Sequence, residues 1–431
     1  MRYEQIDSAL FIANRERLRS ELKPNSIVVL HSNDLLPTNA DGVMNFKQNS
    51  DMIHLTGADQ EETILLLYPD AVNEKQREIL FVRETNEHIA IWEGAKYTKE
   101  KATEISGIEN VQWCESFDDI FHNLVQQAEN IYLCTNEHLR AEVSVETRND
   151  RFIKKCQNAY PLHNYQRLAP IMHKLRMIKH PLEIEIMQKA CSITEAGFRR
   201  ILGLVAPAVG EWEVEAAFTH EFLCRGSKGH AYTPIIGGGH SACVLHYIDN
   251  HDRLEDGDML LMDAGAEYGN WNSDMTRTIP VNGKFTDRQR AVYNSVLRVM
   301  RRANEILRPG LTPLDYQAQV LGYMEEELIS LGLIDAEEAK KQDASKPLVK
   351  RYFMHGTSHH IGLDVHDVNT PNAAFEVGMV FTIEPGIYIR EENLGIRLEN
   401  NYLIGETENI DLMKNIPIEA DEIEALMAAA Q

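Results

Sequence analysis

The segment HGTSHHIGLDVHD, residues 355–367, contains four histidines: His355, His359, His360 and His366. An imidazole can bind a metal ion, carry a proton near neutral pH or pack among other side chains. The segment lacks the HExxH pattern, so a zincin-type zinc site is not expected. We expect one of these histidines to be a metal ligand and others to handle protons or substrate. The acids that complete such a site must come from elsewhere in the chain.

Two aspartates flank a predicted turn in DMLLMDAGAEYGNWNSDMTRTIPV, residues 258–281. Tyr268-Gly269-Asn270 separates two apolar-rich runs and is a good turn signal. A hairpin centred between residues 268 and 269 places Asp263 opposite Asp274, with their Cβ atoms roughly 4.5–5.5 Å apart. Two buried aspartates in these positions need a cation between them. The alternative is that one or both face solvent.

Two glutamates occur in similar surroundings. Glu384 ends an apolar run in FEVGMVFTIEPGIYI, and Glu399 follows Leu398 in GIRLENNYLI. Each alone is more simply explained as a structural or surface acid. Together with Asp263 and Asp274 they place four acids on predicted core strands, and this coincidence favours a shared cation site.

The elements around these residues indicate two domains. The first ~170 residues alternate short apolar runs with helical patterns. They predict strands over 26–32, 63–69, 78–84 and 88–94 and a helix over 120–128, which is an α/β domain with a mixed sheet.

After Leu168-Ala169-Pro170 the pattern changes. A long amphipathic helix is predicted from Pro181, a residue suited to a first helical turn. Further helices are predicted over 287–307 and 313–331. Gly-rich, strand-like segments cover residues 232–248, 257–281 and 376–405. Helices packed on an antiparallel sheet form an α+β architecture.

The charge composition indicates which kinds of binding partner are not expected. The chain of 431 residues has 43 basic and 66 acidic residues, a net charge of −23. This charge argues against nucleic acid or an anionic membrane as the main partner. The six cysteines form no CxxC pair and the N-terminus has no apolar signal segment, so we expect a cytoplasmic protein with no membrane span.

These motifs resemble the pita-bread metallopeptidases, most closely the aminopeptidase P (Xaa-Pro aminopeptidase) family. The matching segments, in family order, are FKQNSDMIHLTG (46–57), AIWEGAKYT (90–98), VLHY (244–247), MDAGAEYGNWNSDMTRT (262–278), HGTSHHIGLDVHD (355–367), TIEPGIYI (382–389) and GIRLEN (395–400). The resemblance implies an aminopeptidase P-type N-terminal domain over 1–170. It implies a pita-bread catalytic domain, an antiparallel sheet covered by helices, over 171–431.

The resemblance also implies a site for two divalent metal ions. Its ligands would be Asp263, Asp274, His359, Glu384 and Glu399. Asp274 and Glu399 would bridge the ions, Asp263 would bind one, and His359 with Glu384 would bind the other. Four carboxylates are neutralised by two dications, and mostly oxygen ligands favour Mn²⁺, with Co²⁺ or Zn²⁺ as alternatives.

The implied activity is removal of the N-terminal residue from peptides with proline in the second position, by attack of a hydroxide that bridges the metal ions. Glu384 resembles the general base of the family. His246 and His366 resemble residues that hydrogen-bond the substrate carbonyl or carry protons. His360 has no family role, and its sequence neighbours suggest packing.

Substrate binding is implied for four residues. His355, Arg397 and Tyr232 would form walls of the proline pocket. Trp92 resembles a tryptophan that reaches a neighbouring subunit's site, although packing within a sheet explains it equally well. If it does reach across, the protein works as a homo-oligomer, a dimer or a tetramer.

Two alternatives stay open. The nearer one is an Xaa-Pro dipeptidase (prolidase), which shares the metals and the chemistry but closes its pocket around dipeptides. The remote one is a metal-free relative, a binding module or creatinase-like hydrolase, which the presence of all five ligands disfavours. The chain departs from many relatives at Asn400-Asn401, where those proteins carry acids.

Overall fold

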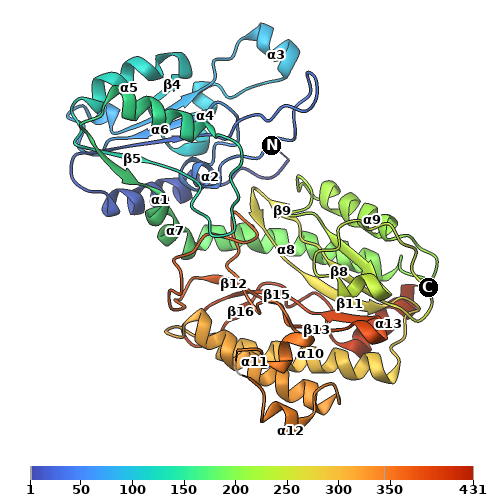
Figure 1. Cartoon of the computed structure of the whole chain (residues 1–431). Coiled ribbons are helices and arrows are strands. Elements are labelled where there is room, and N and C mark those ends of the chain that lie inside the picture. The colour runs from blue at the N-terminus through green and yellow to red at the C-terminus, as the bar shows by residue number, and fades with distance from the viewer. Residues whose placement is uncertain (1, 344, 431) are drawn as a thin grey trace. The chain divides into compact units, whose positions relative to one another are not determined.

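The computed structural model describes residues 2–343 and 345–430. The chain divides into two compact units. The N-terminal unit consists of Glu4–Arg176 with Val368–Thr370, and the C-terminal unit is built mainly from Met177–Asp367 and the chain that follows Thr370. Figure 1 shows both units by residue number. In the described part of the chain, no helix is long and apolar enough to cross a membrane.

A six-stranded mixed sheet forms the N-terminal unit, in the order β4-β3-β2-β1-β5-β6. Strands β1 to β6 cover Ser26–His31, Ile64–Leu67, Glu78–Val82, Val111–Trp113, Asn130–Leu133 and Asn164–Arg167. The pairs β1/β2 and β2/β3 are antiparallel and the other pairs are parallel. The predicted strands over 26–32, 63–69 and 78–84 are therefore confirmed, as is the mixed sheet.

Helices cover both faces of this sheet because both faces are apolar. Alternate residues of a strand point to opposite faces, so Val28 and Leu30 of β1 enter one core and Ile27 and Val29 enter the other. The helices of the unit are α1 (Ser8–Glu21), α2 (Ser50–Thr56), α3 (Glu87–Glu93), α4 (Lys99–Ser106), α5 (Phe117–Val125), α6 (Arg148–Ala159) and α7 (Ala169–Met177). The helix predicted over 120–128 corresponds to α5.

The strand predicted over 88–94 is wrong, because this segment is the short helix α3. The side chain of Asn86 caps the helix by accepting from the backbone N–H of Ile89, and Gly94 ends it with a φ of 80°. None of its residues is buried. A short apolar run fits a strand or a helix equally well, and here the two capping residues decide.

The C-terminal unit contains short antiparallel strands. One sheet has the order β11-β8-β7 and another has the order β12-β15-β16, and β9/β10 and β13/β14 form two-stranded ribbons. The bounds of β7 to β16 are Ile235–Gly238, Met259–Asp263, Glu267–Tyr268, Trp271–Asn272, Thr276–Pro280, Val380–Ile383, Gly386–Ile389, Leu394–Arg397, Asn400–Leu403 and Ile410–Asp411. These strands confirm the antiparallel sheet that the sequence predicts.

Long helices lie along these strands, with α8 and α9 beside β7 to β10 and α10 beside β12 to β14 (Figure 1). The helices α8 to α13 cover Pro181–Leu202, Glu211–Cys224, Asp287–Ile306, Pro313–Ser330, Ala336–Ala339 and Ala420–Ala430. Helix α8 begins at Pro181 as predicted, and α10 and α11 match the predictions over 287–307 and 313–331. In α10 the residues Val292, Val296, Val299 and Ala303 are buried at helical spacing. The predicted α+β architecture is confirmed.

The hairpin over 258–281 forms, but its predicted register is wrong. Asp263 pairs with Thr276, and Tyr268 pairs with Trp271. The turn is Gly269-Asn270, with φ of 60° and 77°, and these positive values at two central residues are those of a type I′ turn. Asp274 is therefore not the direct partner of Asp263. It lies in the gap between β10 and β11, where the ladder is interrupted.

Candidate metal centre

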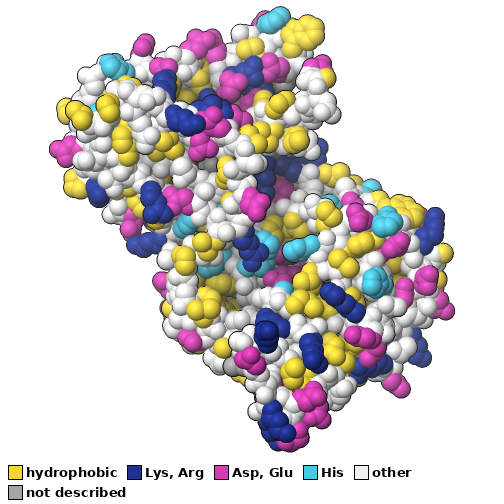
Figure 2. All heavy atoms as spheres, viewed as in Figure 1, with side chains coloured by type: hydrophobic (Ala, Val, Ile, Leu, Met, Phe, Trp, Pro, Cys, Tyr) yellow, Lys and Arg dark blue, Asp and Glu magenta, His cyan; other side chains and the backbone are white. Residues whose placement is uncertain are grey.

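The four candidate acids of the C-terminal unit stand at ends of strands. Asp263 is the last residue of β8, and Asp274 comes shortly before β11. Glu384 directly follows β12, and Glu399 directly precedes β15. The four acids therefore lie where regular strand pairing begins or ends. On the face that Figure 2 shows, histidine and acidic side chains of this unit gather around a hollow.

Short contacts bring these acids together with His359. The hydroxyl of Tyr232 lies 2.5 Å from Asp263 Oδ1 and 2.5 Å from Asp274 Oδ1. His359 Nε2 lies 3.5 Å from Asp274 Oδ2 and 3.5 Å from Glu384 Oε1. Asp274, His359 and Glu399 each offer one ligand atom, and these atoms lie within 4.8 Å of one another. The five residues thus form one cluster from four separate segments.

Burial makes this cluster costly when its carboxylates are charged. Burial and the neighbouring acids raise the pKa of Glu399 well above its ordinary value. Burial also raises the pKa of Asp274, and that of Glu384 from 4.5 to about 7. For His359, burial opposes protonation, but the hydrogen bond to Asp274 and the charge of Glu384 outweigh it and raise the pKa. Protons or cations must therefore balance the charge.

The donor set fits divalent cations. Glu399 Oε1 is buried and has no hydrogen-bond partner, whereas buried carboxylate oxygens are normally satisfied. Four carboxylates and one imidazole are the ligands that hard or borderline dications accept. A cation bound among these residues would both contact the unpaired Glu399 Oε1 and offset the cost of burying the charged carboxylates.

Hydrogen bonds from neighbouring strands orient the carboxylates. The Glu399 side chain accepts from Thr276 Oγ1 at 2.7 Å, and its backbone N–H donates to the Thr276 carbonyl at 3.0 Å. Arg397 Nη2 donates to Asp263 Oδ2 at 2.7 Å, and both side chains are nearly buried. Glu399 and Asp263 are therefore each held by a side chain from a strand outside their own sheet.

His355 belongs to a chain of hydrogen bonds that includes Arg397. Arg397 Nη1 donates to the hydroxyl of Tyr388 at 2.8 Å, and this hydroxyl lies 2.8 Å from His355 Nε2. His355 Nδ1 lies 2.7 Å from the carbonyl of Gly356, which fixes the tautomer with the proton on Nδ1. Burial, and then the charge of Arg397, lower the pKa of His355 to about 3. His355 is thus a neutral ring beside Glu384, with 3.7 Å between Nδ1 and Oε2.

The other histidines differ in their surroundings. The ring of His366 meets that of His359 edge-on, with centroids 4.3 Å apart, and its side chain is exposed. His246 is exposed as well. His360 is buried against Phe381, with ring centroids 4.0 Å apart. This contact agrees with packing as the role of His360.

Two predicted substrate-binding residues, Tyr232 and Trp92, belong to different units. The Tyr232 hydroxyl contacts Asp263 and Asp274 directly. Trp92 belongs to α3 of the N-terminal unit and is 78% exposed. Sequence reasoning missed Tyr388 and Thr276. They lie inside the matching segments 382–389 and 262–278, but their residue types do not distinguish them from their neighbours. Only the register of the strands shows that they touch His355 and Glu399.

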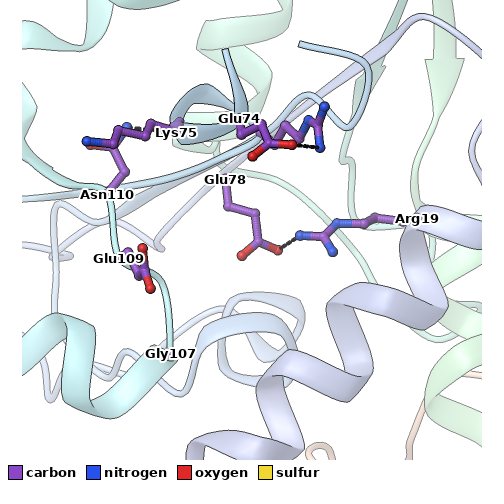
Figure 3. Close-up of a pocket in the computed structure, with 8 residues that line it drawn as sticks. Arg19, Glu74, Lys75, Glu78, Gly107, Glu109 and Asn110 are labelled. Atoms are coloured by element: carbon purple, nitrogen blue, oxygen red, sulfur yellow. Dashed lines mark hydrogen bonds and ion pairs between the residues drawn. The ribbon is translucent and has the colours of Figure 1, made fainter. Parts of the chain in front are cut away.

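The N-terminal unit has a separate hollow of about 630 Å³ (Figure 3). Charged side chains line it, and two pairs among them neutralise each other: Arg19 with Glu78, and Arg77 with Glu74. The described residues that line it include no histidine or cysteine. Nothing in this hollow resembles the convergent ligand set of the C-terminal unit.

Comparisons with known proteins agree with this geometry. Residues 185–406 match the model of metallopeptidase family M24, and residues 11–132 match the aminopeptidase P N-terminal domain. Xaa-Pro aminopeptidase of Escherichia coli is 32% identical over 99% of both chains. The structure of Pseudomonas aeruginosa aminopeptidase PepP is similar, with a TM-score of 0.90, 28% identity and 99% coverage of each chain. Zinc-substituted E. coli aminopeptidase P in complex with product has a TM-score of 0.88 and 30% identity, and covers 99% of this chain and 100% of its own.

Proposed function

This chain belongs to metallopeptidase family M24 and is a metal-dependent aminopeptidase, and we propose that its substrates are peptides with proline in the second position. The names of its similar relatives support this substrate class. The observation that carries the proposal is the cluster of Asp263, Asp274, His359, Glu384 and Glu399 beside the neutral His355 and Arg397. This arrangement places a candidate cation site next to a pocket wall formed by His355 and Arg397. Such a wall does not require a hydrogen bond from a backbone N–H of the substrate, and an Xaa-Pro bond has no N–H.

We assign the five clustered residues as ligands of two divalent ions, with Asp274 and Glu399 shared between them. When bound, the ions would activate a water molecule as nucleophile and polarise the scissile carbonyl. The buried, orphaned oxygen of Glu399 supports the assignment. Mn²⁺ is our choice of metal because most ligands are carboxylate oxygens.

The chain's own residues would then move protons and stabilise charge. Glu384 would accept the proton that the nucleophile loses and pass it toward the leaving amine. His366 and His246 are exposed and would donate hydrogen bonds to the carbonyl oxygen as it gains negative charge. His355 and Arg397, which Tyr388 links, would form a rigid wall of the pocket beside the proline ring. Tyr232 would complete this wall.

The wider organisation follows from the same proposal. Residues 1–170 would form the aminopeptidase P-type domain and 171–431 the catalytic domain. The exposed Ile91 and Trp92 of α3 are suited to meet a neighbouring subunit, so we propose a homo-oligomer. The six free cysteines support a reducing compartment, the cytoplasm.

A cleavage assay tests the substrate class. With added Mn²⁺, Ala-Pro-Ala should release alanine, and a chelator should abolish the release until Mn²⁺ is restored. Ala-Ala-Ala controls for general aminopeptidase activity and should be cleaved far more slowly. Cleavage of the dipeptide Ala-Pro but not of the tripeptide would instead assign a dipeptidase, and activity that resists chelation would contradict the metal site.

A further inference from the structure

The side chain of Asn401 holds the backbone of Asp274 at both of its polar groups. Asn401 Oδ1 accepts from the Asp274 N–H at 3.1 Å, and Asn401 Nδ2 donates to the Asp274 carbonyl at 2.7 Å. The residues lie far apart in the sequence, and Asn401 is 0% exposed. One amide thus satisfies two backbone groups that have no strand partner, because Asp274 lies between β10 and β11.

A side chain with one donor and one acceptor meets both demands at once. The Asp274 N–H requires an acceptor, and its carbonyl requires a donor. A carboxylate at position 401 would turn an oxygen toward the carbonyl oxygen, and an apolar side chain of the same size would leave both backbone groups unsatisfied. The Asn401 amide therefore supplies the two hydrogen bonds that a neighbouring strand would supply in an uninterrupted ladder.

Asn401 is itself fixed from two sides. Its backbone pairs with Thr382 across β12 and β15, and its carbonyl accepts from the Leu412 N–H at 2.9 Å. Glu399 lies two residues before Asn401, directly ahead of β15. The segment that carries Glu399 consequently also anchors Asp274.

We propose that Asn401 is a positioning residue that ties Asp274 to the segment of Glu399 and so fixes the spacing of the two carboxylates shared by the metal ions. This inference rests on the proposed function. Partners that orient metal ligands typically change metal affinity by roughly 10- to 100-fold when they are removed. Asn401→Leu should therefore weaken Mn²⁺ binding at least about tenfold.

The test measures Mn²⁺ affinity by calorimetry and the visible absorption spectrum of the Co²⁺-loaded protein, which reports ligand geometry. The variants are Asn401→Leu and the isosteric Asn401→Asp. Matched controls are Asn409→Leu and Asn409→Asp, because the Asn409 amide also donates to backbone carbonyls, those of Asn304 and Leu307, but contacts none of the five ligands. Thermal unfolding in chelator measures the stability of every variant.

The expected result is weaker Mn²⁺ binding for Asn401→Leu and an altered Co²⁺ spectrum for both Asn401 variants. The Asn409 variants should lose stability and keep wild-type metal binding. Wild-type affinity and spectrum in folded Asn401 variants would overturn the inference, and so would equal metal defects in the Asn409 variants. If Asn401→Leu does not fold, the spectrum of Asn401→Asp decides. A wild-type protein that binds no dication would refute the proposed function instead.

Discussion

At the scale of single residues, the environment separates histidines that the sequence presents as equals. His355 and His360 are held neutral, since burial lowers the pKa of each to about 3. His359 lies between Asp274 and Glu384, which favour its charged form. His366 is exposed, and its ring meets that of His359 edge-on. Their different roles follow from these neighbours rather than from spacing in the motif.

Replacing His366 by alanine should therefore separate proton handling from metal binding. We expect kcat for Ala-Pro-Ala to fall roughly 10²-fold or more, the usual contribution of a positioned proton donor. The metal content by atomic absorption should stay at the wild-type value, because the imidazole is not among the five proposed ligands. His220→Ala, an exposed histidine of α9, serves as the control. Unchanged kcat in His366→Ala would remove this residue from the mechanism.

At the scale of elements, strand ends and turns decide where the ligands lie. The sequence predicts the hairpin over 258–281 but misplaces its turn, because Tyr268, Gly269 and Asn270 all belong to the turn signal. The structure selects Gly269-Asn270, the pair that adopts positive φ. In 88–94 the caps Asn86 and Gly94 outweigh the apolar run. Such local choices depend on backbone angles and capping bonds, which a hydrophobic pattern does not specify.

Gly265 offers a test at this scale, since it lies in the hairpin between the two aspartates. A Cβ at Gly265 would lie 1.9 Å from the backbone oxygen of Ser273, so Gly265→Ala must push the hairpin arms apart. We expect a loss of at least about 1–3 kcal/mol in the free energy of unfolding, together with reduced metal content. Urea unfolding in chelator and metal analysis measure the two effects.

Gly322→Ala in α11 is the matched control, because a Cβ there meets nothing within 4 Å. Alanine favours a helix over glycine by up to about 1 kcal/mol, so this variant should be neutral or stabilised. A Gly265→Ala protein as stable and as rich in metal as the control would show that the hairpin does not need this close approach.

At the scale of the whole molecule, the sequence reveals the candidate ligands better than it reveals the residues that hold them in place. Acidic residues next to apolar strands are easy to recognise in a sequence, and the four predicted acids do lie together with His359 in the structure. The sequence does not identify Tyr388, Thr276 or Asn401 as supports of the site. Their contacts with His355, Glu399 and Asp274 depend on strand registers set across the unit. The net charge of −23 is spread over the surface in Figure 2 and identifies no site by itself.

The acids of the site should make the stability of the protein depend on pH and metal together. Their raised pKa values, about 7 for Glu384, mean that the folded chain binds more protons than the unfolded chain between about pH 4.5 and about pH 7. This contribution to the free energy of unfolding is present at low pH and is lost as pH rises through that window. A dication bound at the proposed site would replace the protons and reverse the loss of stability.

The rise in melting temperature on adding Mn²⁺ to chelator-treated protein should consequently grow from about pH 5 to about pH 8. Differential scanning fluorimetry in matched buffers measures it. Glu399→Gln, which removes one of the shared carboxylates, should flatten the trend. An increment that is the same at every pH would mean that the titrating acids do not bind the metal.

The most direct measurement is anomalous diffraction at the manganese edge from crystals grown with Mn²⁺. Two peaks are predicted, both enclosed by Asp263, Asp274, His359, Glu384 and Glu399, with oxygens of Asp274 and Glu399 within about 2.0–2.6 Å of each peak. A single peak, no peak among these residues, or peaks elsewhere on the chain would contradict the dinuclear site.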